Sequence, residues 1–321
     1  MGLRTGIAGY GLAGAVFHAP LIDAVDGLDL THVMTRSAER AAQAREAHAG
    51  VEVVESLDAL LEDIDVLVVA SPNSSHAEIA LAGLERGLFV VIDKPMAVTS
   101  ADARRVAEAG EERVTVFHNR RWDGDFLTVQ RLVRSGALGQ VTRFESRFER
   151  FRPEIKEGWR EGGDPAEGGG ILLDLGPHLV DQAIQLFGPP ETVYGEVITR
   201  REGALVDDDA FIALTHAGGE ISHLWMSAVA PLHDERFRVS GMERGFAVSG
   251  LDPQEEQLRE GMRPGDPGFG EKKGLEPGHY LAFYEGVREW ANGGAAAPVD
   301  PWDAVRVLEV LEQARSVRQD S

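Results

Sequence analysis

Asp174 and His178 combine residue types and a spacing that suit acid–base chemistry. Because they are four positions apart, a helical backbone would place both on one face. A carboxylate beside an imidazole orients the ring and raises its basicity, and the pKa of histidine lies nearest to neutral pH. We therefore predict that His178 is a general base held by Asp174. The alternative is a histidine whose hydrogen bonds are satisfied in a domain interface.

Lys94 is the next candidate, because it stands where a buried strand must end. The apolar run 89–92 is typical of a strand buried on both faces, and Pro95 cannot donate to a β ladder. Open α/β sheets bind their ligands at the carboxyl ends of such strands. Only four of the 32 basic residues are lysines, which favours a role that arginine cannot fill. The alternative is a solvated or salt-bridged lysine.

Gly9, Gly11 and Gly14 have the spacing of a dinucleotide-binding loop, and they lie between a short strand and a helical pattern. Such glycines permit a tight turn, a close approach of the backbone to pyrophosphate, and close helix–strand packing. The amides at the start of the helix, at Leu12 and Ala13, then face the phosphates. The alternative is that the glycines serve only a turn.

The residues that follow the second predicted strand, 28–34, discriminate between cofactors. An NAD site usually has an acid there that binds the ribose 2′-hydroxyl, and this chain has none. Arg36, Ser37 and Arg40 suit a 2′-phosphate instead. Ser37 is also a plausible N-cap of the helical pattern at 37–47. We predict NADP as the cofactor; the alternative is that Arg36 is a surface residue and that the site accepts NADP or NAD.

Three further segments are assigned to the cofactor cleft, each with an alternative. The turn 71–73 closes a buried strand and would lie under the cofactor, unless it is an ordinary loop. His76 either caps its helix or touches the ligand, and we favour the cap. Arg120 and Arg121, beside Trp122, suit an anionic or hydroxylated ligand and equally suit a hinge held by ion pairs. The residues predicted to bind the cofactor are Gly9, Gly11, Leu12, Ala13, Gly14, Arg36, Ser37, Arg40, Ser71, Pro72, Asn73, His76, Lys94, Pro95, Arg121 and Trp122.

The order of the secondary-structure patterns predicts an α/β protein of two domains. Strand and helix patterns alternate at short spacing through residue 118, which indicates an NAD(P)-binding Rossmann domain with a doubly wound parallel sheet at 1–118. From residue 140 the chain reads mostly as strands with short connections, which indicates a largely antiparallel open sheet. We assign 119–321 to an α/β domain for substrate binding and oligomerisation.

Two local features of the second domain are also predicted. Pro177 is expected in the first turn of a helix. The segment 251–277 reads as a long loop or broad hairpin that is a flap, an oligomer contact or merely mobile.

Composition excludes several classes of function. The formal net charge is −21 and the pI about 4.9, which argues against binding to nucleic acids or to anionic membranes. The absence of cysteine excludes disulfides, thiolate chemistry and cysteine-type zinc sites, and no metal site is predicted. The chain has neither an apolar run of membrane-spanning length nor a signal peptide, so we expect a cytoplasmic protein.

Taken together, Gly9-x-Gly11-x-x-Gly14, Asp93-Lys94-Pro95 and Gly168-Gly169-Gly170…Asp174-x-x-x-His178 resemble the glucose–fructose oxidoreductase/inositol dehydrogenase/rhizopine-catabolism (Gfo/Idh/MocA) family. Three further segments resemble its NADP-dependent scyllo-inositol dehydrogenase subgroup. These segments are Phe17-His18-Ala19-Pro20-Leu21, Asn119-Arg120-Arg121-Trp122-Asp123 and Arg152-Pro153-Glu154.

The resemblance implies a polyol, inositol or sugar substrate, and a homodimer or homotetramer formed through the C-terminal sheet. It also implies that Lys94 is the lysine of the family's Glu-Lys-Pro motif and that Asp174 and His178 are its catalytic pair. The chain departs from the family in having Asp93 before the lysine, where Glu is commoner. The segment between Gly250 and His279 is also shorter than in the scyllo-inositol enzymes, which bears on the substrate.

The predicted reaction is the reversible oxidation of a secondary alcohol or of an anomeric hydroxyl. In this hypothesis His178 takes the hydroxyl proton, Asp174 steadies the ring, and Lys94 stabilises the developing alkoxide. One alternative is a non-catalytic NADP(H)-binding sensor or regulator. A second alternative, known in the family, is a glycoside hydrolase that uses a transient oxidation.

Overall fold

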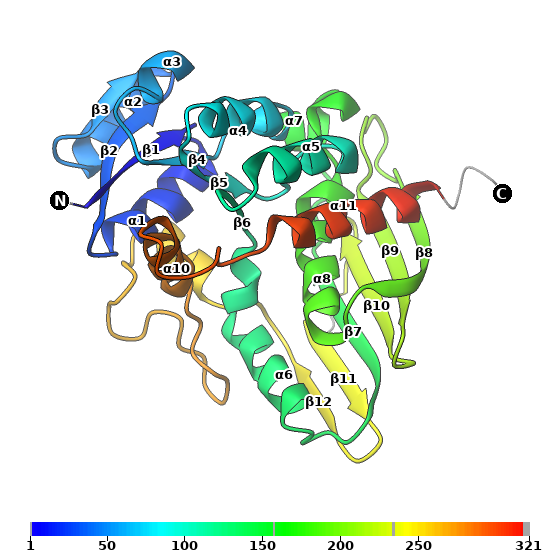
Figure 1. Cartoon of the computed structure of the whole chain (residues 1–321). Helices are drawn as coiled ribbons and strands as arrows, with labels where there is room; N and C mark the ends of the chain where they lie inside the picture. Colours follow the sequence, from blue (N-terminus) through cyan, green and yellow to red (C-terminus); the bar gives the residue numbers. More distant parts are fainter. Residues whose placement is uncertain (1, 157, 233–234, 317–321) are drawn as a thin grey trace.

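The structure is a computed structural model that describes residues 2–156, 158–232 and 235–316. It contains two six-stranded sheets, as Figure 1 shows. Sheet A has the order β3-β2-β1-β4-β5-β6, and every pair in it is parallel. Its strands are β1 (Leu3–Ala8), β2 (Leu28–Met34), β3 (Glu52–Val54), β4 (Val66–Val69), β5 (Phe89–Asp93) and β6 (Val114–Phe117).

Sheet A confirms the predicted doubly wound parallel sheet. All four residues of β4 and the middle of β5 are buried, as expected for strands covered on both faces. The strand order reverses between β1 and β4, so the loops that follow these strands border the crevice where such sheets bind ligands. The surrounding helices and short helical turns are η1 (Ala13–His18), α1 (Ala19–Asp23), α2 (Ala38–Ala47), α3 (Leu57–Leu60), η2 (Asn73–Ser75), α4 (His76–Glu85) and α5 (Ser100–Gly110).

Sheet B has the order β12-β11-β7-β10-β9-β8, and only its β7–β10 pair is parallel. The predicted, largely antiparallel second sheet is therefore confirmed. Its strands are β7 (Val141–Glu149), β8 (Pro190–Ile198), β9 (Asp209–His216), β10 (Ile221–Ser227), β11 (Phe237–Gly241) and β12 (Gly245–Val248). The helical elements of this half are η3 (Asn119–Trp122), α6 (Gly124–Arg134), α7 (Trp159–Gly162), η4 (Pro165–Glu167), α8 (Ile171–Phe187), α9 (Gln254–Arg259), α10 (Leu281–Ala291) and α11 (Pro301–Ser316).

Helix α8 carries Asp174 and His178, and it begins earlier than predicted. Pro177 lies inside the helix and not in its first turn. The reason is a cap supplied from outside the helix. Asp207 accepts hydrogen bonds from the amides of the first two helical residues, through its carbonyl oxygen at 2.8 Å and its carboxylate at 2.7 Å. These contacts satisfy amides that have no partner within the helix.

The two C-terminal helices return to sheet A. Helix α10 places Trp290 edge-on against Phe89, with ring centroids 4.9 Å apart, and its indole nitrogen donates to the carbonyl of Glu112. Helix α11 packs against α5 of the first half and against α8 and β8 of the second (Figure 1). The domain division 1–118 and 119–321 stays a prediction, and it assigns to the second domain two helices that also pack on the first.

The segment 251–277 contains the short helix α9. The C-terminal helical pattern expected at 303–317 begins earlier, at Pro301, and residue 317 lies outside the described part of the chain. Within the described residues, no helix has both the length and the apolar character needed to cross a membrane.

Candidate active site

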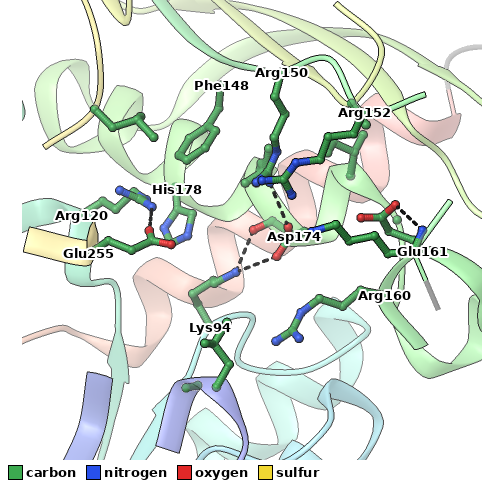
Figure 2. Close-up of a pocket in the computed structure, with 18 of the residues that line it drawn as sticks. Lys94, Arg120, Phe148, Arg150, Arg152, Arg160, Glu161, Asp174, His178 and Glu255 are labelled. Atoms are coloured by element: carbon green, nitrogen blue, oxygen red, sulfur yellow. Dashed lines mark hydrogen bonds and ion pairs between the residues drawn. The ribbon is translucent and has the colours of Figure 1, made fainter. Parts of the chain in front are cut away.

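A cavity of about 850 Å³ lies where the carboxyl end of β5 meets α8. Lys94, Asp174 and His178 all line it, although the lysine is separated from the other two by 80 positions or more (Figure 2). Its other walls include the glycine loop, the end of β7, α9, and the side chains of Arg150, Arg152, Lys156, Arg160 and Glu161. The three residues singled out for chemistry are therefore brought to one place.

Lys94 and Asp174 form an ion pair in the cavity. The Lys94 Nζ donates to the Asp174 backbone carbonyl at 2.8 Å and to its Oδ1 at 3.3 Å. The Arg150 guanidinium lies 3.6 Å from Oδ2 of the same carboxylate. Burial acts to raise the pKa of Asp174, but the positive charges of Lys94, Arg160 and Arg150 lower it below its ordinary value. Asp174 is therefore ionised at neutral pH.

His178 shares a face of α8 with Asp174, as predicted, but no hydrogen bond joins the two side chains. His178 is 5% exposed, and its buried Nδ1 has no hydrogen-bond partner among the described residues. Burial, followed by the charge of Lys94, lowers the pKa of His178 well below its usual value. The expectation that Asp174 raises the basicity of the ring is wrong, because the carboxylate is engaged by Lys94 and Arg150. The ring is neutral at pH 7 and able to accept a proton.

The three loop glycines differ in what surrounds them. A Cβ atom at Gly9, whose φ is +103°, would lie 2.7 Å from the carbonyl oxygen of Ala70, and one at Gly14 would lie 2.2 Å from that of Gly9. A Cβ at Gly11 would meet only the Arg40 Nη1, 3.9 Å away. Packing thus explains the first and third glycines, whereas the second borders open space that a pyrophosphate could occupy.

The helix after this loop starts with a π-helical turn, η1, and continues as α1. Ser37 caps α2 as predicted, since its hydroxyl accepts from the amide of Arg40 at 3.3 Å. The Arg36 Nε donates to the carbonyl of Glu55 at 3.3 Å. Of the two arginines, it is Arg40 whose guanidinium reaches the glycine loop.

The residues that follow β4 link loops to one another. His76 does not cap its helix: its ring nitrogens lie 2.8 Å from the carbonyl oxygen of Pro95 and 2.9 Å from that of Ser71. The cap prediction is therefore wrong, because the imidazole lies between the loops that follow β4 and β5. Asn73 donates to the carbonyl of Gly168 at 3.0 Å and joins the same edge of sheet A to the start of α8.

Arg121 and Trp122 do not line the cavity. Arg121 donates to both carboxylate oxygens of Asp181, at 2.9 and 2.6 Å, and to Asp303 at 2.9 Å. Trp122 packs edge-on against Phe283, with centroids 5.6 Å apart. This arrangement matches the alternative of a hinge held by ion pairs. Of the residues predicted to bind the cofactor, only Leu12, Ala13 and Lys94 line the cavity.

Replacing Arg121 with methionine is expected to lower the free energy of unfolding by about 3–5 kcal/mol, because it leaves buried Asp181 without its partner. The control is Arg86→Met, which removes an exposed pair with Asp58 and should cost less than about 1 kcal/mol. Urea unfolding of both variants gives the comparison. Equal losses would contradict the structural role of Arg121.

Sequence reasoning considered Arg120 for a ligand or a hinge, and it missed other side chains of the cavity wall. Arg120 and Glu255 form an ion pair at 2.6 Å, and Phe148 and Arg150 come from the end of β7. The alternating pattern of β7 continues to Arg150 and offered a signal. The segment 251–277 was expected to contribute to the walls of the pocket, but its composition did not single out Glu255 as a residue that reaches the site.

The comparisons with known proteins agree with this geometry. Residues 3–120 match a family described as "Oxidoreductase family, NAD-binding Rossmann fold", and residues 126–247 match the "GFO/IDH/MocA C-terminal domain". The chain belongs to the Gfo/Idh/MocA family. It is therefore an oxidoreductase with a nicotinamide-nucleotide-binding domain, of the dehydrogenase type that acts on CH–OH groups.

Several Gfo/Idh/MocA relatives cover nearly the whole chain. The chain is 38% identical to the uncharacterized oxidoreductase YdgJ of Escherichia coli, over 97% of this chain and 94% of that protein. It is 32% identical to the scyllo-inositol 2-dehydrogenase (NADP(+)) IolW of Bacillus subtilis, over 97% and 92%. The solved structure of the putative oxidoreductase yvaA from Bacillus subtilis superimposes with a TM-score of 0.92 at 31% identity, over 99% and 96%.

Proposed function

We propose that the protein is an NADP-dependent dehydrogenase that transfers a hydride between a hydroxyl-bearing carbon of a polyol, inositol or sugar and nicotinamide. The observation that carries the proposal is the meeting of Lys94, Asp174 and His178 in one cavity that reaches the glycine loop. The name of the relative IolW, an NADP-linked scyllo-inositol dehydrogenase, supports the substrate class and the cofactor.

The residues of sheet A fit a dinucleotide. The open space at Gly11 accommodates a pyrophosphate, and Arg40 beside it supplies a cation for a 2′-phosphate. Leu12 and Ala13 line the cavity that contains Lys94, so the loop and the reacting groups share one space. When bound there, NADP⁺ supplies the hydride acceptor.

The chain's own residues handle the proton and the charge. His178 is neutral at pH 7, so it can take the hydroxyl proton of the substrate. Lys94 is positioned by Asp174 and directs its ammonium into the cavity, where it stabilises negative charge on the substrate oxygen. In this form of the mechanism Asp174 positions the lysine and not the imidazole.

The test is a panel of inositols, aldoses and their oxidised forms with NADP⁺ and NAD⁺, followed at the nicotinamide absorbance band. Net reduction of NADP⁺ with a member of the panel is the expected result. A redox-assisted hydrolase would release product without net reduction, since it regenerates its cofactor. A sensor would show binding of NADPH and no turnover.

Replacing Arg40 with glutamine is expected to weaken NADP⁺ binding about tenfold and to leave NAD⁺ binding near its original value, because only NADP⁺ carries the 2′-phosphate. Fluorescence titration with both reduced cofactors measures the change. Arg45→Gln, on the exposed face of the same helix, is the matched control. Equal losses for both cofactors would contradict the assignment.

We further propose a homodimer or homotetramer formed through sheet B. Helix α8 covers one face, and half-buried aromatic rings occupy the other. Phe211 and Trp225 have ring centroids 5.1 Å apart, and the Arg147 guanidinium stacks 3.9 Å from the Trp225 ring centroid. Trp225→Glu places a charge in this face and is expected to reduce the mass measured by light scattering to that of a monomer. An unchanged mass would contradict this interface.

A further inference from the structure

One wall of the cavity is built from cationic side chains of a single segment. Arg150 and Arg152 directly follow β7, and their amides donate to the carbonyls of Ser227 and Ala228, which keeps the chain extended there. Residues two apart on an extended chain point to the same side. Figure 2 shows both guanidinium groups beside Asp174, in the cavity that Lys156 also lines.

The acidic groups on this wall do not balance its charge. Asp174 is shared between Lys94 and Arg150, and Glu161 is paired with Arg201 at 2.8 Å, while the more distant charge of Lys156 also lowers the pKa of Glu161. The side chains of Arg152 and Lys156 have no ion pair within the described parts of the chain. Arg152 and Lys156 therefore carry positive charge that no ion pair of the described residues takes up, and both side chains are exposed in the cavity wall.

The two neighbouring arginines also repel each other. Burial chiefly lowers the pKa of Arg150, Asp174 raises it, and the charge of Arg152 lowers it again. A chain with a net charge of −21 has acidic side chains throughout, yet this segment points its cations at one space. The opposite wall has acids on α9, of which Glu255 is already paired with Arg120 and Arg259.

The phosphates of the cofactor do not account for this wall. Their predicted place is the glycine loop and Arg40, which belong to sheet A. Arg152 and Lys156 follow a strand of sheet B and line the cavity from the other side of Asp174. A second anion in the cavity would pair with them, and the far end of the substrate is the group that has no assigned partner.

Building on the proposed function, we infer that the substrate is itself an anion. It is a polyhydroxylated molecule with a carboxylate or phosphate that Arg152, together with Arg150 and Lys156, binds, while its reacting hydroxyl lies at His178 and Lys94. Arginine suits both groups, because its planar fork donates two parallel hydrogen bonds to a carboxylate or a phosphate.

The experiment compares neutral and anionic compounds on one ring. Wild-type enzyme saturated with NADP⁺ is assayed with D-glucose, D-glucuronate and D-glucose 6-phosphate, and with myo-inositol and its 1-phosphate. At least one anion is expected to exceed its neutral counterpart in kcat/KM by about tenfold or more. A factor of this size corresponds to the free energy of one charge-assisted hydrogen bond. The uronate and phosphate arms identify which anionic group is bound.

Variants then test the named residues. Arg152→Gln and Lys156→Gln are each expected to reduce the preference for the anion over the neutral compound about tenfold, mainly through KM. Arg134→Gln and Lys273→Gln remove the same charges from exposed positions outside the cavity wall and should leave the preference unchanged. Raising the NaCl concentration should increase KM for the anion more than for the neutral compound.

Three outcomes decide between the two proposals. Turnover of neutral compounds with equal or better kcat/KM leaves the proposed function standing and overturns the anionic substrate. Turnover of none of the compounds counts against the proposed function. In that case, the same compounds are titrated calorimetrically into the NADP⁺-saturated protein. The inference of an anionic substrate then holds if an anion binds more tightly than its neutral counterpart and Arg152→Gln removes the difference. Any other result overturns it.

Discussion

Replacing His178 with asparagine is expected to lower turnover by about 100- to 10,000-fold, the usual contribution of a positioned general base. Asparagine has similar bulk but cannot accept a proton at neutral pH. The dissociation constant for NADPH should stay close to that of the wild type, because the imidazole lies on α8 and not in the glycine loop. Nicotinamide absorbance gives the turnover, and NADPH fluorescence gives the binding.

The control for His178→Asn is His216→Asn, which removes a buried imidazole from sheet B. His216 contacts the carbonyl of Gly188 at 3.0 Å and the hydroxyl of Ser222 at 2.9 Å, so its loss should lower stability. Turnover per folded molecule should not change in that variant. Wild-type turnover in His178→Asn would remove the general-base assignment.

The pH profile gives a second test of His178. Its pKa lies well below 6.5, mainly through burial, so kcat/KM should rise with pH through that lower value and be level near pH 7. The acidic limb due to this group should be absent from His178→Asn.

The lowered pKa of His178 also affects the stability of the fold. Between the folded-state pKa and about 6.5 the unfolded chain binds more protons, so this group makes the protein less stable as the pH falls.

Replacing Lys94 with methionine is expected to lower kcat/KM by about 100- to 1,000-fold, comparable to the loss of one donor that stabilises an oxyanion. Methionine retains most of the apolar stem but removes the ammonium. The pKa of Asp174 should rise in this variant, because it loses the cation that most lowers it. Turnover of the best substrate in the panel measures the effect.

Two further variants make the Lys94 prediction specific. Lys94→Arg keeps the charge but replaces a compact ammonium with a planar fork, and it should not restore turnover. Lys272→Met removes a lysine that donates to the carbonyls of Ser249 and Gly250, and should leave kcat/KM unchanged. Full activity in Lys94→Arg would show that charge alone suffices at this position.

Local patterns were enough to predict sheet A. The buried run that ends at Asp93, the cap at Ser37 and the glycine loop are each determined by residues adjacent in sequence. The start of α8 could not be predicted in this way. Its first amides are satisfied by Asp207, which lies 35 positions after Leu172 in the first turn, so no local signal marked the boundary.

The candidate site shows the same division between local and distant determinants. The i, i+4 spacing correctly placed Asp174 and His178 on one face of a helix. It could not show that Lys94, 80 positions earlier, would take the carboxylate instead. Arg121 is a similar case, because Asp303 lies 182 positions away. Spacing gives the direction of a side chain, whereas competition among partners in the folded chain decides its contact.

Helix α11 also constrains the order of events during synthesis. The strands of sheet A are complete at Phe117, but the hydroxyl of Thr115 on β6 donates to the carbonyl of Val299, 184 positions later. Glu312 on α11 likewise binds the start of α5 through the amide of Ser100 at 2.7 Å. A nascent chain therefore leaves this flank of its first sheet uncovered until the ribosome has translated through α11. Final closure of the N-terminal half therefore waits for the synthesis of α11 and does not directly follow the synthesis of sheet A.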